Sequence, residues 1–371
     1  MKKPALTPLA QTLPATVPFV GPETQERCMG QVFRARLGAN ESGFGPSPKA
    51  ITAMQAAAAD IWKYGDPENH ELRHALAQHH DVSADNIMIG EGIDALLGLI
   101  VRLYVGPGDA VVTSDGAYPT FNYHVAGFGG DLHKVAYRGD HEDPQAVCAK
   151  ALQTGAKLIY FANPDNPMGS WHGADVIQAM IDDLPDGCLL VLDEAYVDLA
   201  PAGTAPKIDT DAANVLRMRT FSKAHGLAGA RIGYAIGQRD VISGFNKVRN
   251  HFGISRIGQE AALAALSDTE WLSHVQKMVA ASRKAIADIA RANGLTPLPS
   301  ATNFVTIDCG GDGAFAQAVL SELVARGIFV RMPFVAPQNR CIRVSCGPDE
   351  QISAFGATLP EALAAAHKKL R

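Results

Sequence analysis

Between residues 86 and 220, short apolar runs alternate with longer amphipathic ones. The apolar runs are NIMIG, DAVVTS, KLIYFANP, CLLVLDEAY and NVLRMRTF, and helix-like stretches such as DALLGLIVRLY, FNYHVAGFG and GADVIQAMIDDL lie between several of them. Apolar runs of strand length that alternate with helical patterns are typical of a largely parallel sheet covered by helices. We therefore expect an α/β layer as the main body of the chain.

The last third of the chain has a different pattern. A long helical stretch runs from about residue 256 to Gly294, and the short apolar runs NFVTIDC, IFVRM and CIRVSC precede a final Ala-rich helix. Because 371 residues exceed what one core usually supports, two domains are expected. We predict a Pro-rich extended segment over residues 1–35, a large domain over 36–260 and a smaller α+β domain over 261–371. A ligand crevice is expected between the two domains.

Composition narrows the classes of partner. The net charge of -5 gives no basic surface for nucleic acid or anionic membrane, so small molecules and further copies of the chain are the expected partners. The six cysteines form no CxxC pair, and no metal site is expected. The N-terminal run lacks a continuous apolar core, and no apolar run is long enough to cross a bilayer. A cytoplasmic protein is the prediction.

The segment TFSKAHGLAGARIGYAIG contains the strongest chemical signal. Lys223 stands in a Ser-Lys-Ala-x-Gly-x-x-Gly-x-Arg frame that ends at Arg231. A lysine can form a Schiff base with an aldehyde cofactor, while Ser222 and Arg231 offer donors for a phosphate. That combination points to pyridoxal phosphate. The alternative is a solvated lysine in an ordinary Gly-rich turn.

Other polar residues follow the ends of expected strands, where open α/β sheets collect ligands. Asp193 ends CLLVLDEAY and suits a protonated pyridine nitrogen, and Tyr196 and Asn166 suit a phenolic oxygen. A strand-end aspartate in water, and plain turn chemistry for Asn166, are the alternatives. Tyr118 suits stacking on a planar ring or a place in the core. Arg343, among apolar residues, needs an anion, either a substrate carboxylate or an internal acid.

The start of the expected helix after NIMIG allows two interpretations. Backbone amides at Gly92, Ile93 and Asp94 would form an anion site at a helix N-terminus. The same Gly90-x-Gly92-x-x-Ala95 turn also fits a dinucleotide fingerprint, with Asp115 where a ribose-binding acid is expected. A nicotinamide oxidoreductase would not need Lys223. His70 and His74 have a metal-ligand spacing, but a solvated helix face is the preferred interpretation.

Taken together, these residues resemble the class I/II, fold-type I aminotransferases that depend on pyridoxal phosphate, and within them the histidinol-phosphate aminotransferase group. The resemblance covers nearly the whole chain and rests on ordered motifs, namely LGANESGFGPSP, KYGDP, AYPTF, NPDNPMG, DEAY, TFSKAHGLAGARIGY, TNFV, GIFVR and IRVSCG. It implies a large domain with a mostly parallel seven-stranded sheet, a smaller C-terminal domain and a homodimer. The implied reaction moves an amino group from an amino acid or histidinol phosphate to a 2-oxo acid such as 2-oxoglutarate.

The resemblance also implies a role for each site residue. Lys223, Asp193 and Tyr196 would be catalytic, with Lys223 as the cofactor-bound lysine and proton carrier. Asp193 would hold the pyridine nitrogen, Tyr196 and Asn166 the phenolic oxygen, and Tyr118 the ring face. The expected phosphate ligands are Gly92, Ile93, Asp94, Ser222, Arg231 and, from the partner subunit, Tyr64. The expected substrate contacts are Arg343, Arg331 and Asn40.

Some positions depart from the family pattern. Residues Gly92 to Ala95 read Gly-Ile-Asp-Ala instead of the usual Gly-Ser-Asp-Glu, and the usual Asn-Asn-Pro-Thr-Gly begins with Asp165 and has Met168. Phe19 stands where a phosphate-binding tyrosine is common, whereas Arg331 is kept. Histidinol phosphate is therefore one candidate donor among others. A decarboxylase or carbon-sulfur lyase of the same fold stays open, and a ligand-sensing regulator is discounted because no DNA-binding segment precedes residue 35.

Overall fold

The main body of the protein is a seven-stranded sheet. The computed structural model describes residues 3–15 and 19–370. The strands lie in the order β2 (Ile87–Gly90), β8 (Gly233–Gly237), β7 (Val215–Thr220), β6 (Leu189–Asp193), β5 (Leu158–Ala162), β3 (Ala110–Ser114) and β4 (Asp131–Val135). The five strands from β7 to β4 are mutually parallel, and β8 runs antiparallel to both of its neighbours. The predicted mostly parallel sheet of seven strands is confirmed.

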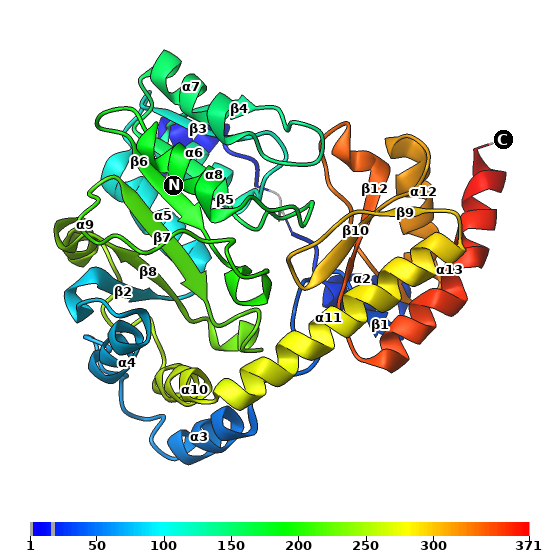
Figure 1. Ribbon diagram of the computed structural model, residues 1–371, viewed down its shortest axis with the longest axis horizontal. Coiled ribbons are helices and arrows are strands. Elements are labelled where there is room, and N and C mark those ends of the chain that lie inside the picture. The colour runs from blue at the N-terminus through cyan, green and yellow to red at the C-terminus, as the bar shows by residue number, and fades with distance from the viewer. Residues whose placement is uncertain (1–2, 16–18, 371) are drawn as a thin grey trace.

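Helices cover both faces of this sheet, which explains why its central strands are apolar throughout (Figure 1). Every residue of β5 and β6 is buried. One face packs on α5 (Ile93–Tyr104) and α6 (Thr120–Phe128), and the other on α7 (Pro144–Thr154) and α8 (Ala174–Asp182). A sheet buried on both faces needs continuous apolar strands rather than alternating ones.

The C-terminal part has a separate core. It contains the antiparallel order β12 (Cys341–Ser345), β10 (Phe304–Asp308) and β9 (Thr296–Pro297), packed on α11 (Thr269–Ala292), α12 (Gly313–Ala325) and α13 (Asp349–Lys369). A segment near the N-terminus also belongs to this part, because β1 (Ala35–Arg36) pairs in parallel with β11 (Ile328–Phe329). The three predicted short strands and the last helix are therefore present, and the strand within IFVRM is β11.

The two parts meet along the helical stretch expected over 256–294. It is two helices, α10 (Arg256–Ser267) and α11, because Asp268 caps the second by accepting from the amide of Trp271 at 3.4 Å. α10 packs with α3 (Pro48–Ala58) and α4 (His70–His80) of the large part, whereas α11 (yellow) crosses to the small part (Figure 1). We accordingly propose a domain boundary at Asp268, close to the expected division at 260.

The sequence patterns missed several elements. The segment expected to be extended, 1–35, contains α1 (Pro8–Thr12) and α2 (Pro22–Met29), and its residues 1–2 and 16–18 lie outside the described residues. The strand β4 (DLHKV) is mostly polar and β8 (GYAIG) is rich in glycine, so neither was recognised as an apolar run. The remaining short helices are η1 (Ala84–Asn86), η2 (Val197–Leu199), η3 (Ala228–Ala230), α9 (Arg239–Gly244), η4 (Phe245–Lys247) and η5 (Gln338–Arg340). Within the described ranges, none of the helices has the length and apolarity that a membrane crossing requires.

Candidate functional site

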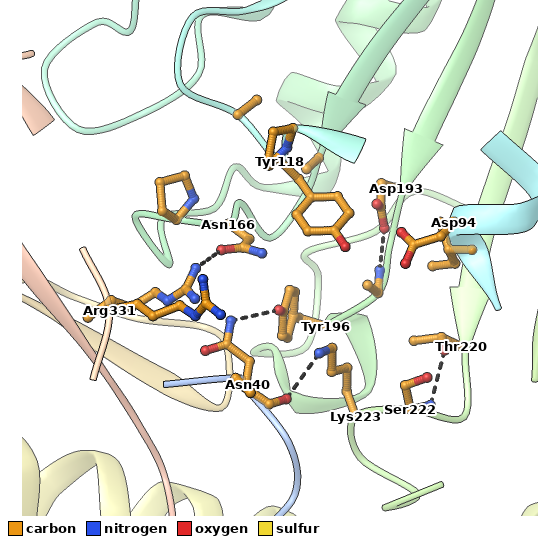
Figure 2. A pocket seen from close by; sticks show the side chains of 18 of the residues that line it. Asn40, Asp94, Tyr118, Asn166, Asp193, Tyr196, Thr220, Ser222, Lys223 and Arg331 are labelled. Carbon is orange, nitrogen blue, oxygen red and sulfur yellow. Dashed lines mark hydrogen bonds between the residues drawn. The ribbon is translucent and has the colours of Figure 1, made fainter. Parts of the chain in front are cut away.

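A cavity of about 580 Å³ opens at the carboxyl ends of the parallel strands. The ends of β5, β6 and β7 and the turn after β3 form its walls, since parallel strands bring their carboxyl ends to one edge. The N-terminal segment and loops of the small part complete it, as Figure 2 shows. The cavity is lined by Asn40, Ile93, Asp94, Tyr118, Asn166, Asp193, Tyr196, Ser222, Lys223, Arg231, Arg331 and Arg343.

Lys223 lies just beyond β7 and extends its amine into this cavity. Its Nζ donates to the backbone oxygen of Asn40 at 3.0 Å and lies 5.6 Å from the ring centre of Tyr196. Removal from water lowers the pKa of Lys223 to about 8, and Arg343 adds to that effect. A substantial fraction of this amine is therefore neutral near pH 8, which is the form that attacks a carbonyl group.

Asp193 ends β6 at the bottom of the cavity, with an exposed fraction of only 6%. Its Oδ2 accepts from the hydroxyl of Tyr160 at 2.6 Å, and its Oδ1 accepts from the amide of Ala195 at 2.9 Å. Burial raises the pKa of Asp193 to about 6, although both donors lower it. Such a carboxylate is stabilised further by a cationic group placed against it.

Tyr196 and Asn40 form a second hydrogen-bonded pair beside the lysine. The Nδ2 of Asn40 donates to the hydroxyl of Tyr196 at 3.1 Å (Figure 2). The Oδ1 of Asn40 accepts from the hydroxyl of Ser345 at 3.0 Å. Asn40 has a φ of 55°, in the left-handed region that asparagine tolerates better than most residues. Burial raises the pKa of Tyr196 to about 12, so its phenol remains a donor at neutral pH.

Arg343 reaches the cavity from β12 of the small part. Its Nη1 donates to the Oδ1 of Asn166, and its Nη2 donates to the backbone oxygen of Gly38 at 3.2 Å. Its Nε is buried without a partner among the described residues. Burial lowers the pKa of Arg343 to about 10, so the side chain is a cation in need of an anion.

The N-terminus of α5 forms an anion cradle together with Arg231. Gly92 caps the helix with a φ of 81°, and a Cβ there would lie 2.5 Å from an Nη of Arg231. The same guanidinium lies 3.8 Å from Asp94. Ser222 is buried nearby in the cavity wall. Free amides at a helix N-terminus and an arginine are the donors that bind phosphate in proteins.

Aromatic and cationic side chains surround the mouth of the cavity. Tyr118 stacks on Phe19 with ring centres 6.4 Å apart. The guanidinium of Arg331 lies 5.9 Å from the ring of Phe19, and its Nη2 donates to the backbone of Val20 at 2.7 Å. No acidic side chain of the described residues forms an ion pair with Arg331. Phe334, which is 67% exposed, also lines the cavity.

The expected residues that do not gather here are informative. Tyr64 is 76% exposed and packs on Phe252, outside the cavity of its own chain. Asp115 pairs with Lys134 at 3.2 Å. β3, which precedes it, is separated from β2 by four strands, and β2 is an antiparallel edge strand. The Gly90–Gly92 turn and Asp115 therefore do not form a dinucleotide site. His70 and His74 lie in contact, but no cluster that could hold a metal occurs among the described residues.

Sequence reasoning missed three contributors. Tyr160 lies within a fully buried strand, so no alternation of residues showed which face its hydroxyl takes. Asn303 donates to the backbone oxygen of Asn40 at 3.0 Å. It lies in the TNFV motif, which marked the segment but did not indicate a role for this residue. Phe334 lies in a loop without any pattern.

Comparison with known proteins agrees with this geometry. The family model for class I and II aminotransferases matches residues 35–357. A histidinol-phosphate aminotransferase of Jannaschia sp. is 34% identical over 337 residues, which cover 91% of this chain and 93% of that protein. The corresponding enzyme of Moorella thermoacetica is 32% identical over 346 residues, covering 92% and 89%.

Solved structures agree as well. A histidinol-phosphate aminotransferase from Sinorhizobium meliloti, in complex with pyridoxal-5'-phosphate, has 53% identity and a TM-score of 0.95, with 99% of this chain and 98% of that chain covered. The aspartate aminotransferase of Thermus thermophilus with maleate, at 22% identity and a TM-score of 0.80 over 97% and 100% of the two chains, shares the fold. The chain belongs to the class I and II aminotransferase family and has its fold-type I architecture.

Proposed function

We propose that this member of the class I and II aminotransferase family transfers an amino group from histidinol phosphate to 2-oxoglutarate, giving the corresponding carbonyl compound and glutamate. The observation that carries the proposal is the meeting of three side chains in one cavity. Asp193 ends β6, Lys223 follows β7 and Arg343 lies within β12. The relatives are aminotransferases, which favours this reaction over a decarboxylase, a lyase or a nicotinamide oxidoreductase.

The residues present fit pyridoxal phosphate. An amine of lowered pKa, a buried carboxylate and a helix N-terminus beside Arg231 match its aldehyde, its pyridine nitrogen and its phosphate. The absence of a side chain at Gly92 keeps that helix start open, because a Cβ would collide with Arg231. When bound, the cofactor supplies an electrophilic carbon and an electron-withdrawing ring.

Each residue then has a role that follows from its surroundings. Lys223 binds the cofactor covalently and, once released, moves a proton at its Nζ, which a pKa of about 8 suits. Asp193 holds a proton on the ring nitrogen, because Tyr160 and the amide of Ala195 fix its two oxygens. In this proposal, Asn166 and Tyr196 donate hydrogen bonds to the phenolic oxygen. Tyr118 covers the ring face.

The rest of the set binds phosphate and substrate. We assign the cofactor phosphate to the amides of Gly92, Ile93 and Asp94 and the side chains of Ser222 and Arg231. Arg343 binds a carboxylate of the second substrate, 2-oxoglutarate, since its orphan Nε needs an anion. Asn40 orients both Lys223 and Tyr196. Arg331, a half-buried guanidinium at the mouth, is the proposed ligand of the substrate phosphate.

A homodimer completes the proposed site. The exposed side chains of Ile61, Trp62, Tyr64 and Phe252 form an apolar surface of the kind that partner subunits cover. Tyr64 from the partner subunit would then reach the cofactor phosphate. Five of the six cysteines are buried free thiols, which suits a reducing compartment, and we propose the cytoplasm.

Single-turnover spectroscopy tests the donor. Purified protein loaded with pyridoxal phosphate is mixed with histidinol phosphate and, separately, with histidinol and with aromatic, aliphatic and acidic amino acids. We expect the visible absorbance of the lysine-bound cofactor to decay fastest with histidinol phosphate. Faster decay with an ordinary amino acid would move the substrate elsewhere within the family. The Lys223→Ala variant, which cannot bind the cofactor covalently, is the control and should never show that band.

A further inference from the structure

Behind the turn that carries Asn166, two buried carboxyl groups contact each other. Glu142, in the segment between β4 and α7, and Asp165, in the turn after β5, are each 2% exposed. Their side chains are hydrogen-bonded to one another. Two ionised carboxylates offer only acceptors and repel, so one of the two must keep a proton.

The other donors show which group keeps it. Asp165 accepts from the hydroxyl of Tyr137 at 3.0 Å, from the amide of Met168 at 3.1 Å and from the amide of Asn166. Burial raises the pKa of Asp165 to about 6 and raises that of Glu142 well above its ordinary value. Glu142 is therefore the group that holds the proton at neutral pH and donates it to Asp165.

Neutral donors, and no cationic side chain, contact the carboxyl group of Glu142 within the described residues. Its oxygens accept from Ser114 at 2.6 Å and from the amide of Ala162 at 3.2 Å. The titratable and charged groups around the pair are Tyr137, Tyr160, Asp115 with Lys134, Asp143 with Arg138, His141, His172 and Arg343. The Nε2 of His172 bonds the backbone oxygen of Glu142, at 2.8 Å, and not its carboxyl group. Neither carboxyl forms an ion pair among residues 3–15 and 19–370.

The pair supports the turn that faces the substrate site. The amide of Gly169 donates to the backbone oxygen of Asp165 at 3.1 Å, and the amide of Asp165 donates to Ser170 at 2.9 Å. This closed turn presents the Oδ1 of Asn166 to Arg343. An asparagine at position 165, the usual family residue, would carry its own amide donor. An aspartate lacks one, so a neighbouring acid has to bring the hydrogen.

We propose that Glu142 is a positioning residue, which acts as a neutral acid by donating the hydrogen bond that completes the contacts of Asp165 and thereby holds Asn166 beside Arg343. The inference rests on the proposed function, because it takes Asn166 and Arg343 to be cofactor and substrate ligands. It adds to the site a residue that touches neither cofactor nor substrate.

Kinetics of the cofactor-loaded enzyme test the positioning. Glu142→Gln keeps a donor and the side-chain shape, so its KM for 2-oxoglutarate should stay within about twofold of wild type. Glu142→Ala leaves Asp165 one donor short, and its KM should rise about tenfold with a smaller change in kcat, the scale of one buried hydrogen bond. Equal damage in both variants, or an unchanged KM in Glu142→Ala, would overturn the proposal.

The pH dependence of stability provides a readout that a simple packing role would not move. The pKa of Glu142 is higher in the folded protein than in the unfolded chain, so its contribution to the free energy of unfolding falls as pH rises above the ordinary carboxyl range. Glutamine does not titrate, so the Tm of Glu142→Gln relative to wild type should rise between pH 5 and pH 8. The matched control is Glu322→Gln. Glu322 pairs with Arg326 and Lys369, which lower its pKa, so this variant should instead have a lower Tm than wild type by an amount that stays constant from pH 5 to pH 8.

The outcomes separate this inference from the function on which it rests. An inactive wild-type enzyme would remove the proposed function, whereas the Tm trend would still report whether Glu142 is protonated. An active wild type whose Tm difference from Glu142→Gln does not grow with pH would overturn the inference alone. If Glu142→Ala fails to fold, Asp165→Asn replaces it. That variant supplies its own donor and removes the carboxylate that raises the pKa of Glu142, so the further change Glu142→Gln should then gain less Tm with rising pH than it gains in wild type. An equal gain in both backgrounds would overturn the proposal.

Discussion

The site has two regions built in different ways. Its floor consists of Lys223, Asp193, Tyr160 and Tyr196. These residues come from β5, β6 and the segments that follow β6 and β7, and hydrogen bonds between 2.6 and 3.1 Å hold them. Its rim consists of Phe19, Arg331 and Phe334, which come from the N-terminal segment and from a loop of the small part. In the rim, the guanidinium of Arg331 packs on the ring of Phe19 and donates to the backbone of Val20.

This difference separates chemistry from substrate choice. Strand register fixes the floor, because a shift of one residue would turn every side chain of a strand to the other face of the sheet. The rim is formed by segments that are distant in sequence and partly exposed, so its residues can change without disturbing the sheet. Changes in the floor should therefore affect kcat with every donor, whereas changes in the rim should affect one class of donor.

The largest effect is expected at Asp193. Asp193→Asn removes the charge that holds a proton on the ring nitrogen, so kcat should fall by about three orders of magnitude with every donor, the scale of a lost preorganised electrostatic group. The raised pKa of Asp193 makes the apoprotein lose stability as pH rises through about 6. The Tm of the apo variant at pH 8 should therefore equal or exceed that of wild type. A loss confined to phosphorylated donors would contradict the division between floor and rim.

The next largest effect is expected at the rim. Arg331→Met removes the proposed charged contact to a substrate phosphate, worth roughly 1.5–3 kcal/mol, so kcat/KM for histidinol phosphate should fall at least about tenfold. Histidinol, which lacks the phosphate, is the matched substrate and should react with unchanged kcat/KM. Steady-state kinetics with both donors measures this. Equal losses with both would mean that Arg331 supports the floor rather than the substrate.

The two regions also differ in how far the sequence revealed them. Lys223, Asp193 and Asn166 directly follow apolar runs, so the sheet topology alone brought them to one edge. Tyr160 escaped notice because a fully buried strand shows no alternation. Glu142 lies in an irregular segment, and only the fold reveals that Asp165 is its neighbour.

Local sequence patterns also failed to predict the contacts of the rim and two strands of the sheet. The contact between Arg331 and the Phe19–Val20 segment joins positions 311 residues apart, which no local pattern contains. The strands β4 and β8 were missed because one is polar at an edge and the other is glycine-rich. Sequence thus predicted the parts of the fold and site that depend on local order along the chain, and missed those that depend on long-range packing.

A moderate effect is expected at Tyr160. Tyr160→Phe keeps the ring stacked on Phe121, whose centre lies 4.9 Å away, but removes the donor to Asp193. Loss of this hydrogen bond should lower kcat about tenfold. Because that donor lowers the pKa of Asp193, the acid limb of the pH–rate profile should also move to higher pH.

The matched control for Tyr160→Phe is Tyr234→Phe. Tyr234 is a buried tyrosine of β8, but its hydroxyl bonds His80 at 2.9 Å and does not reach the cavity. This variant should lose stability while keeping the pH profile of wild type. An unmoved acid limb in Tyr160→Phe would show that Asp193 is positioned without Tyr160, and the floor would then depend on the backbone alone.

The smallest effect is expected at Phe19, and it distinguishes the two regions most sharply. Phe19 lies between Tyr118 and the guanidinium of Arg331, so a tyrosine there would place a hydroxyl at the mouth of the cavity without changing the stacked rings. One added hydrogen bond to a phosphate should lower KM for histidinol phosphate about threefold, with kcat unchanged. The double variant Phe19→Tyr/Arg331→Met should lose this gain, because the phosphate is no longer held nearby. A gain that persists in the double variant, or that also appears with histidinol, would show that the hydroxyl acts on the floor, and the rim would no longer be a region of substrate choice alone.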